Sequence, residues 1–135
     1  MSTFKIHVDW KREGLQFKGF NEEGTTLDID GDKQNGTSPM VLLLHAEAAC
    51  TGIDVLTILE KMHQPISDLR IEVEAEKGDG EFPRIWEKIH VRYLISGEVA
   101  PVKAEKAVDL SLDKYCSVSA MLGHAAEITH EIVMK

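Results

Sequence analysis

Cysteine, repeated sequence and flexible linkers are scarce in this chain, and each shortage excludes a class of protein. The 135 residues include 2 cysteines, too few for a small secreted domain held together by disulfides. We find no internal repeat, no low-complexity tract and no linker long enough to separate two domains. The length is typical of one domain. We therefore expect a single domain that spans residues 1–135.

The sequence lacks a long apolar run, a signal peptide and an excess of basic residues, and this argues against membrane and nucleic-acid partners. No uninterrupted apolar run approaches the ~20 residues that cross a bilayer, and the first five residues show no feature of a signal peptide. The chain has 23 acidic against 15 basic residues, a net charge of −8, whereas phosphate backbones are bound by clustered Lys and Arg. We expect a cytoplasmic protein that binds neither membranes nor nucleic acid.

The first third of the sequence predicts short strands. Apolar and polar residues alternate over 3–10, and this pattern is typical of a half-buried strand. A turn at 12–14 leads to a second strand over 15–20, and a turn at 21–24 leads to a third over 25–30. A polar, glycine-bounded loop follows.

A long helix is predicted next. Ser38 is a good N-cap and Pro39 suits the first helical position, and residues 40–62 contain no proline and much Leu and Ala. The pattern is apolar on most sides, which indicates a buried helix, and Gly52 is expected where another element packs closely. About 24 helical residues would extend ~36 Å, long for a domain of ~14 Å radius of gyration. We therefore expect part of the helix to pack on a second copy, in a homodimer.

The remaining sequence predicts further strands and helices. Strict alternation predicts long antiparallel strands over 69–77 and 85–95. An amphipathic helix is predicted over 101–112, a short helical segment over 114–122, and a last strand over 126–134. This order indicates an α+β fold with a largely antiparallel sheet around the long central helix.

The two cysteines are the most distinctive feature. In a reducing cytosol, two isolated cysteines are most simply explained as buried, inert thiols. Their local sequences argue otherwise. Ser38-Pro39-Met40 with Ala49-Cys50-Thr51-Gly52, and later Lys114-Tyr115-Cys116-Ser117, occur in the order of the two cysteine motifs of the OsmC/Ohr family. The chain resembles that family, and in particular its short, uncharacterised OsmC-like branch.

The resemblance implies an intertwined homodimer that reduces organic hydroperoxides. Cys50 would be the attacking thiolate, and Cys116 would resolve the sulfenic acid as a disulfide. A dithiol, commonly a lipoyl group on a protein, would then reduce the disulfide. We expect no cofactor. Many relatives have a proline after the second cysteine, where Ser117 stands here, but the resolving role does not need that proline.

Activation of Cys50 requires a nearby cation. The attacking species is the thiolate, and Cys50 lies far beyond the first helical turn, where the helix dipole acts. In the better-known peroxidases of the family, an arginine of the N-terminal hairpin fills this role. Arg12 is the only arginine in that region and is our candidate, although it could also be a solvated turn residue.

The glutamate that orients this arginine in those peroxidases is absent. Met40 and Val41 stand at its place, and neither side chain can orient a guanidinium. Glu47 and Asp54 lie one turn before and one turn after Cys50. Glu47 could hold Arg12 from a new position, or both carboxylates could disfavour the thiolate by repulsion. For Asp54, a salt bridge or a dimer contact is the preferred interpretation.

A metal site is not expected. His45, Glu47 and Cys50 do not converge on one helical face, and they lack the close pairs of cysteine-containing zinc sites. The other histidines, His124 and His130 among them, are expected at surface or strand positions. Two functions remain: a thiol peroxidase acting on organic hydroperoxides, and a non-catalytic OsmC-like dimer that binds an apolar ligand or senses redox state.

Overall fold

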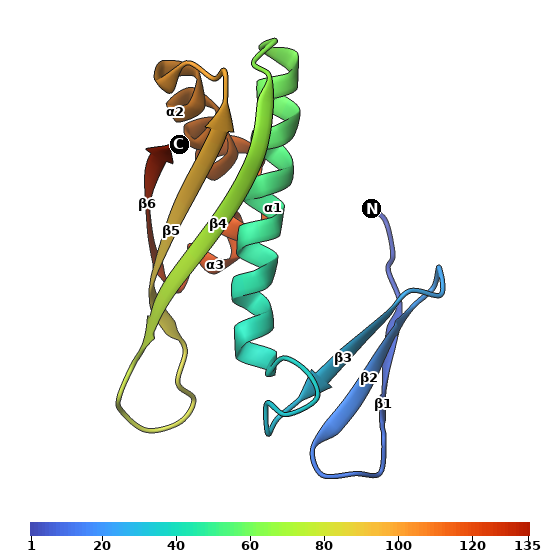
Figure 1. Ribbon diagram of the computed structural model, residues 1–135. Helices are drawn as coiled ribbons and strands as arrows, with labels where there is room; N and C mark the ends of the chain where they lie inside the picture. The colour runs from blue at the N-terminus through green and yellow to red at the C-terminus, as the bar shows by residue number, and fades with distance from the viewer. The chain divides into compact units, whose positions relative to one another are not determined.

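The protein has an α+β fold whose elements agree closely with those expected from sequence (Figure 1). A computed structural model describes all residues, 1–135. The chain divides into two compact units, Met1–Leu43 and Leu44–Lys135. The elements, in order, are β1 (Ile6–Trp10), β2 (Gln16–Asn21), β3 (Thr26–Asp30), α1 (Pro39–Lys61), β4 (Ile66–Lys77), β5 (Trp86–Gly97), α2 (Pro101–Leu110), a π-helical turn η1 (Ser111–Tyr115), α3 (Ser117–Leu122) and β6 (Glu127–Met134).

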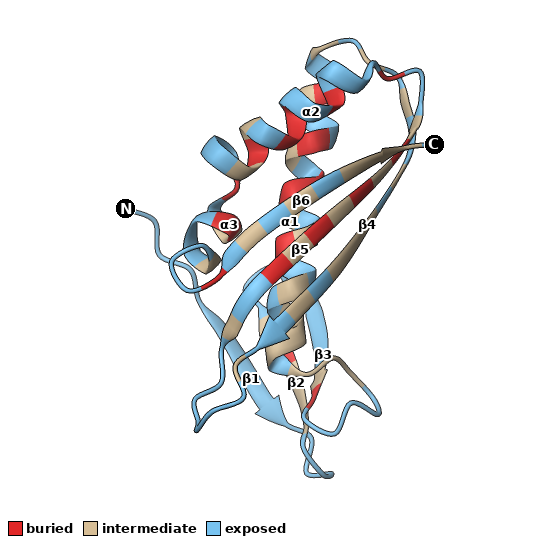
Figure 2. Cartoon of the chain, turned by 90° about the vertical axis from the view of Figure 1, so that its left-hand side faces the viewer, coloured by how far each residue is buried: buried red, intermediate tan, exposed pale blue.

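The first unit is an antiparallel meander, β1-β2-β3. Gly19 at its centre pairs with Val8 on one side and Leu27 on the other. The expected half-burial of the first strand is wrong for the single chain: every residue of β1 is exposed (Figure 2). The alternating residues Ile6, Val8 and Trp10 thus form an exposed apolar strip. The alternating pattern therefore predicted the strand correctly but not its burial.

The loop between β3 and α1 is organised by Asp30. Its buried carboxylate accepts hydrogen bonds from the backbone N–H groups of Asp32, Gln34 and Asn35. These bonds hold the pKa of Asp30 below its ordinary value. The carboxylate therefore fixes the glycine-bounded segment that leads into α1.

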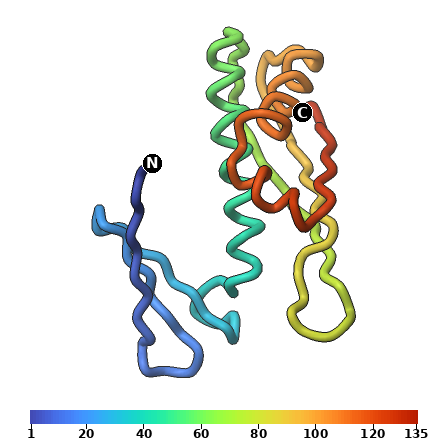
Figure 3. Tube along the Cα trace, turned by 180° about the vertical axis from the view of Figure 1, so that it is seen from behind, coloured from blue at the N-terminus to red at the C-terminus, as the bar shows by residue number.

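The second unit contains the hydrophobic core. β4 and β5 pair antiparallel, and β5 and β6 pair parallel. Because both pairings of the first sheet are also antiparallel, the expected largely antiparallel arrangement is confirmed, with β6 as the exception. A parallel pair needs a long crossover, and α2, η1 and α3 form it. Figures 1 and 3 show the helices on one face of this sheet. The core lies between them and includes Val55 and Leu59 of α1, Tyr93 and Ile95 of β5, and Val108 of α2.

Helix α1 is buried on one face only. The buried residues are Glu47, Thr51, Gly52, Val55 and Leu59. The predicted burial on most sides is therefore wrong for the single chain. Gly52 behaves as expected, since a Cβ there would come within 2.7 Å of the Ile71 side chain of β4.

The opposite face of α1 is apolar and exposed. Ile53 is 64% exposed and Leu56 is 44% exposed. By length and hydropathy, α1 would be long enough to cross a membrane, although Glu47 and Asp54 interrupt its apolar sequence. The same properties suit a core helix, and two acidic side chains of α1 hydrogen-bond to serines of the crossover.

The crossover departs from the predicted helix over 101–112. Helix α2 ends at Leu110, and the chain continues as the wider π-helical turn, η1, to Tyr115. The backbone N–H of Cys116 closes this turn on the carbonyl oxygen of Ser111 at 2.7 Å. Helix α3 then starts directly after Cys116, so the second cysteine lies between two helical segments.

Candidate active site

Cys50 lies near the middle of α1 and is partly accessible. Its helix contributes Glu47 one turn before it and Asp54 one turn after it. Both acids face into the second unit, where Glu47 is fully buried. Cys50 is therefore flanked by two carboxylates on the side of the helix that meets the crossover.

Cys116 is the N-cap residue of α3 and is almost completely buried. Its sulfur accepts a hydrogen bond from the backbone N–H of Ser119 at 3.3 Å. Burial raises the pKa of the Cys116 thiol, and the Ser119 side chain and backbone N–H oppose this effect. The nearby Cys50 thiol and the Glu47 carboxylate raise the pKa further. The two thiols are thus close enough to interact, and both are free.

Glu47 is held by Ser119. The Ser119 hydroxyl approaches the two carboxylate oxygens of Glu47 at 2.5 and 2.9 Å. Burial raises the pKa of Glu47, while the hydrogen bond from Ser119 lowers it in part. No basic residue of the second unit contributes to this environment. Ser119 therefore links Glu47 of α1 to Cys116 of the crossover.

A second acid–serine pair lies on the other side of Cys50. The Ser111 hydroxyl, fully buried at the start of η1, donates to Asp54 Oδ2 at 2.8 Å. Asp54 thus has a hydroxyl partner in place of the salt bridge that was one preferred interpretation, and a dimer contact of Asp54 stays a prediction. Both acids beside Cys50 are thus tied to the crossover by serine hydroxyls.

Tyr93 of β5 closes the inner side of the site. It is fully buried, and its phenol oxygen has no hydrogen-bond partner of good geometry. Burial raises the pKa of Tyr93 to about 12, and the nearby Thr51 hydroxyl opposes the shift while Glu47 and Cys116 add to it. The Thr51 hydroxyl itself donates to the backbone carbonyl of Glu47. The site thus combines two thiols, two acids and a neutral phenol.

The structure places the predicted residues in two groups. Cys50, Cys116 and Glu47 lie together in the second unit. Arg12 lies in the β1–β2 turn of the first unit with a positive φ of 63°, a conformation uncommon for a residue other than glycine. Its role toward Cys50 stays a prediction.

Sequence reasoning missed the serines. Ser111 and Ser119 carry no motif that marks them as partners of acids on a distant helix. The one available signal was the presence of two acidic residues on the otherwise apolar α1, because buried carboxylates need hydrogen-bond donors.

Comparison with known proteins decides the family. The sequence profile of OsmC-like proteins matches residues 30–131. The chain belongs to the OsmC-like family. Protein YhfA of Escherichia coli K12 is 37% identical over 128 residues, which cover 93% of this chain and 94% of YhfA.

Solved structures share the OsmC-like fold along the whole chain. A hypothetical protein from Aquifex aeolicus VF5 superposes with a TM-score of 0.86 at 30% identity, covering 100% of this chain and 99% of that one. The organic hydroperoxide resistance protein OhrB of Bacillus subtilis superposes with a TM-score of 0.64 at 21% identity, covering 97% and 98%. At that identity the likeness to OhrB shows the fold alone.

Glu47 makes the stability of this OsmC-like protein depend on pH. Its pKa is raised in the folded state, so the folded state binds the proton more tightly than the unfolded state does. We expect the contribution of Glu47 to stability to be fully present below the ordinary glutamate pKa of ~4.3 and to be lost as pH rises through the raised value. Glu47→Gln should flatten this dependence, as measured by urea unfolding at a series of pH values. The exposed Glu60→Gln is the control, and equal slopes in both variants would contradict the assignment.

Proposed function

We propose that the protein is a thiol peroxidase that reduces organic hydroperoxides with Cys50 and Cys116. The observation that carries the proposal is the adjacency of a partly accessible thiol, Cys50, and a buried one, Cys116. A substrate would reach the accessible thiol first, and the buried thiol would be protected from direct oxidation. This difference supports an attacking role for Cys50 and a resolving role for Cys116.

The reaction has three steps. The Cys50 thiolate attacks the outer oxygen of the hydroperoxide, the O–O bond breaks, and the alkoxide takes a proton to leave as an alcohol. The resulting sulfenic acid reacts with the Cys116 thiol to form a disulfide and water. A dithiol reductant, such as a lipoyl group on a protein, then reduces the disulfide by exchange and becomes a disulfide itself.

The second step requires Cys116 to lose a proton. Burial and the nearby acid disfavour its thiolate, so the proton needs an acceptor. The Ser119 hydroxyl donates to the Glu47 carboxylate and also interacts with the Cys116 thiol, while the Ser119 backbone N–H donates to the Cys116 sulfur. We infer that Glu47 accepts the proton through Ser119 during resolution. This differs from the role expected from sequence, in which Glu47 orients Arg12.

The first step requires a cation near Cys50, because neither Glu47 nor Asp54 stabilises a thiolate. Arg12 is the candidate that the family resemblance supplies. Its guanidinium presents several N–H donors in a fixed fork and keeps its charge, so it could contact both a thiolate and a peroxide oxygen. Arg12 of the same chain or of a second copy would serve equally.

A homodimer is part of the proposal. The exposed face of α1, with Ile53 and Leu56, and the apolar strip of β1 would both be left in water by a monomer. Contiguous exposed apolar surface commonly marks a protein interface.

We further propose a cytoplasmic location, since two free, reversibly oxidised thiols suit a reducing compartment.

The peroxidase activity is tested by replacing each cysteine in turn. With an alkyl hydroperoxide, hydrogen peroxide and dihydrolipoamide as reductant, the wild type should turn over, with a preference for the alkyl substrate. Cys50→Ser should abolish peroxide consumption. Cys116→Ser should consume about one equivalent and leave a sulfenic acid on Cys50, detectable by trapping and mass spectrometry. Intact thiols in the wild type after peroxide treatment would instead favour a non-catalytic, ligand-binding dimer.

Arg12→Ala should slow the alkylation of Cys50 at neutral pH and move its pH profile upward. A ~10-fold loss would correspond to about 1.4 kcal/mol of transition-state stabilisation. Lys33→Ala is a matched control, because Lys33 is another exposed cation of the first unit with a positive φ, 60°. An unchanged profile in Arg12→Ala would show that Arg12 is only a turn residue.

The dimer is tested by light scattering after size exclusion at low micromolar concentration. We expect a particle of about twice the 15.1 kDa mass of the chain. Ile53→Asp should give a monomer or an unfolded chain, because it places a charge on the exposed apolar face of α1. Val102→Asp replaces a still more exposed apolar residue, on α2, and should remain dimeric. A folded wild-type monomer would refute this part of the proposal.

A further inference from the structure

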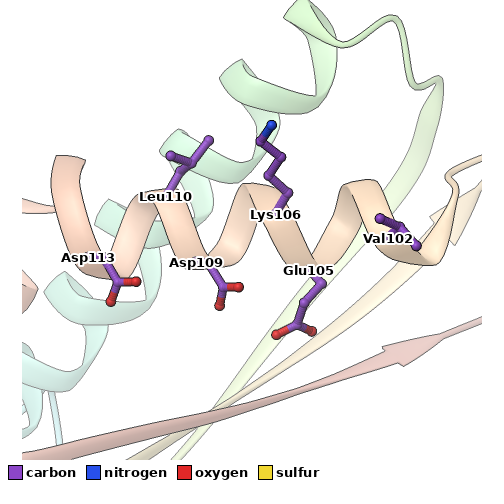
Figure 4. A pocket seen from close by; sticks show the side chains of 6 residues that line it. All are labelled: Val102, Glu105, Lys106, Asp109, Leu110 and Asp113. Atoms are coloured by element: carbon purple, nitrogen blue, oxygen red, sulfur yellow. The ribbon is translucent and has the colours of Figure 1, made fainter.

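Outside the cysteine site, three ligand-type side chains converge between α2 and β6. Glu105 and Asp109 lie one turn apart on α2, and His130 lies on β6. His130 Nε2 is 3.1 Å from Glu105 Oε1 and 3.6 Å from Asp109 Oδ1. One ligand atom from each residue lies within 4.8 Å of the others. Figure 4 shows both acids pointing to the same side of α2.

These separations suit a bound metal ion. Zinc binds imidazole nitrogen and carboxylate oxygen at about 2.0–2.2 Å, and in tetrahedral coordination neighbouring ligand atoms then lie ~3.3–3.6 Å apart. The two measured distances, 3.1 and 3.6 Å, are close to this range. Both carboxylates are about half exposed, and the His130 side chain is 25% exposed. Small side-chain rotations would therefore centre all three ligands on one ion.

The net charge of the three side chains also suits a divalent cation. Two carboxylates and a neutral imidazole carry two negative charges, which a divalent cation would neutralise. Asp113, one turn beyond Asp109, points the same way, whereas Lys106 points to the opposite side of the helix (Figure 4). A hollow of about 280 Å³ beside the cluster is lined by Asp109, Asp113 and His130. It offers room for a fourth ligand, either a water molecule or the Asp113 carboxylate.

We propose that Glu105, Asp109 and His130 form a binding site for a divalent transition-metal ion, with Zn²⁺ preferred. The imidazole favours zinc over magnesium and calcium, which take oxygen ligands. His130 lies on a strand as expected, and the proposal adds a ligand role to that position. The ion would tie α2 to the last strand, and therefore fix both ends of the crossover that carries Cys116. The hollow is also lined by Ser119, whose hydroxyl contacts Glu47.

The test is calorimetric titration of the reduced, full-length protein with Zn²⁺ near pH 7.5, where free imidazoles are mostly neutral. We expect one ion per chain and a loss of affinity of at least ~10-fold in His130→Gln. His124→Gln, which replaces an exposed histidine that is not one of the three proposed ligands, should bind as the wild type does. The double variant Glu105→Gln/Asp109→Asn should also lose binding, and it keeps the test decisive if His130→Gln folds poorly.

Binding to the cysteines is the competing outcome. Co²⁺ distinguishes the two sites, because thiolate ligands give an intense near-ultraviolet charge-transfer band and nitrogen–oxygen ligands do not. We expect visible bands without the thiolate band, and a Zn²⁺-dependent rise in melting temperature that is absent in His130→Gln. Unchanged Zn²⁺ affinity in His130→Gln, a thiolate band in the wild type, or no binding would each overturn the proposal. The cluster would then be an internal ion pair of α2 and β6.

Discussion

The buried carboxylate of Glu47 is the constraint on which the arrangement of the second unit depends. A charged or hydrogen-bonding group removed from water must find a partner within the protein, or it costs several kcal/mol. Here one hydroxyl, that of Ser119, contacts both carboxylate oxygens. A hydrogen bond to a charged group is worth about 1.5–3 kcal/mol. The bond therefore fixes α3 against α1, and with α3 it fixes Cys116, three residues before the serine.

The same contact sets the electrostatics of the thiol pair. Glu47 lies close enough to both Cys116 and Tyr93 to raise their pKa values. In the reduced protein, burial and this negative charge keep Cys116 as a thiol. The backbone N–H of Ser119 and the Ser119 hydroxyl act in the other direction. In the proposed mechanism, this balance would keep Cys116 inert toward external oxidants and still leave it a route for proton loss when a sulfenic acid forms beside it.

The sequence predicted the elements well because their signals are local. Alternation located the strands, Ser38 and Pro39 located the start of α1, and the cysteine motifs led to the family that the comparisons confirm. The parallel pairing of β6 was missed because strand direction depends on the crossover and not on the strand's own pattern. The end of α2 was missed because a π-helical turn closed by the Cys116 N–H leaves no sequence signal. The serine partners of Glu47 and Asp54 were missed because they are more than fifty residues away.

The burial of α1 was mispredicted for a reason that bears on assembly. An ordinary amphipathic helix turns its apolar face to the core and its polar face to water. Helix α1 does the reverse in part: its buried face includes Glu47 and Thr51, while Ile53 and Leu56 face outward. Such inversion is costly in a monomer, because the polar groups need internal partners and the apolar face contacts water. It becomes consistent if the outward face is covered by a second copy, as we propose. The outward face of α1 would then form part of a core shared by two chains. Its inward polar residues, Glu47 and Thr51, would line the cysteine site within each chain.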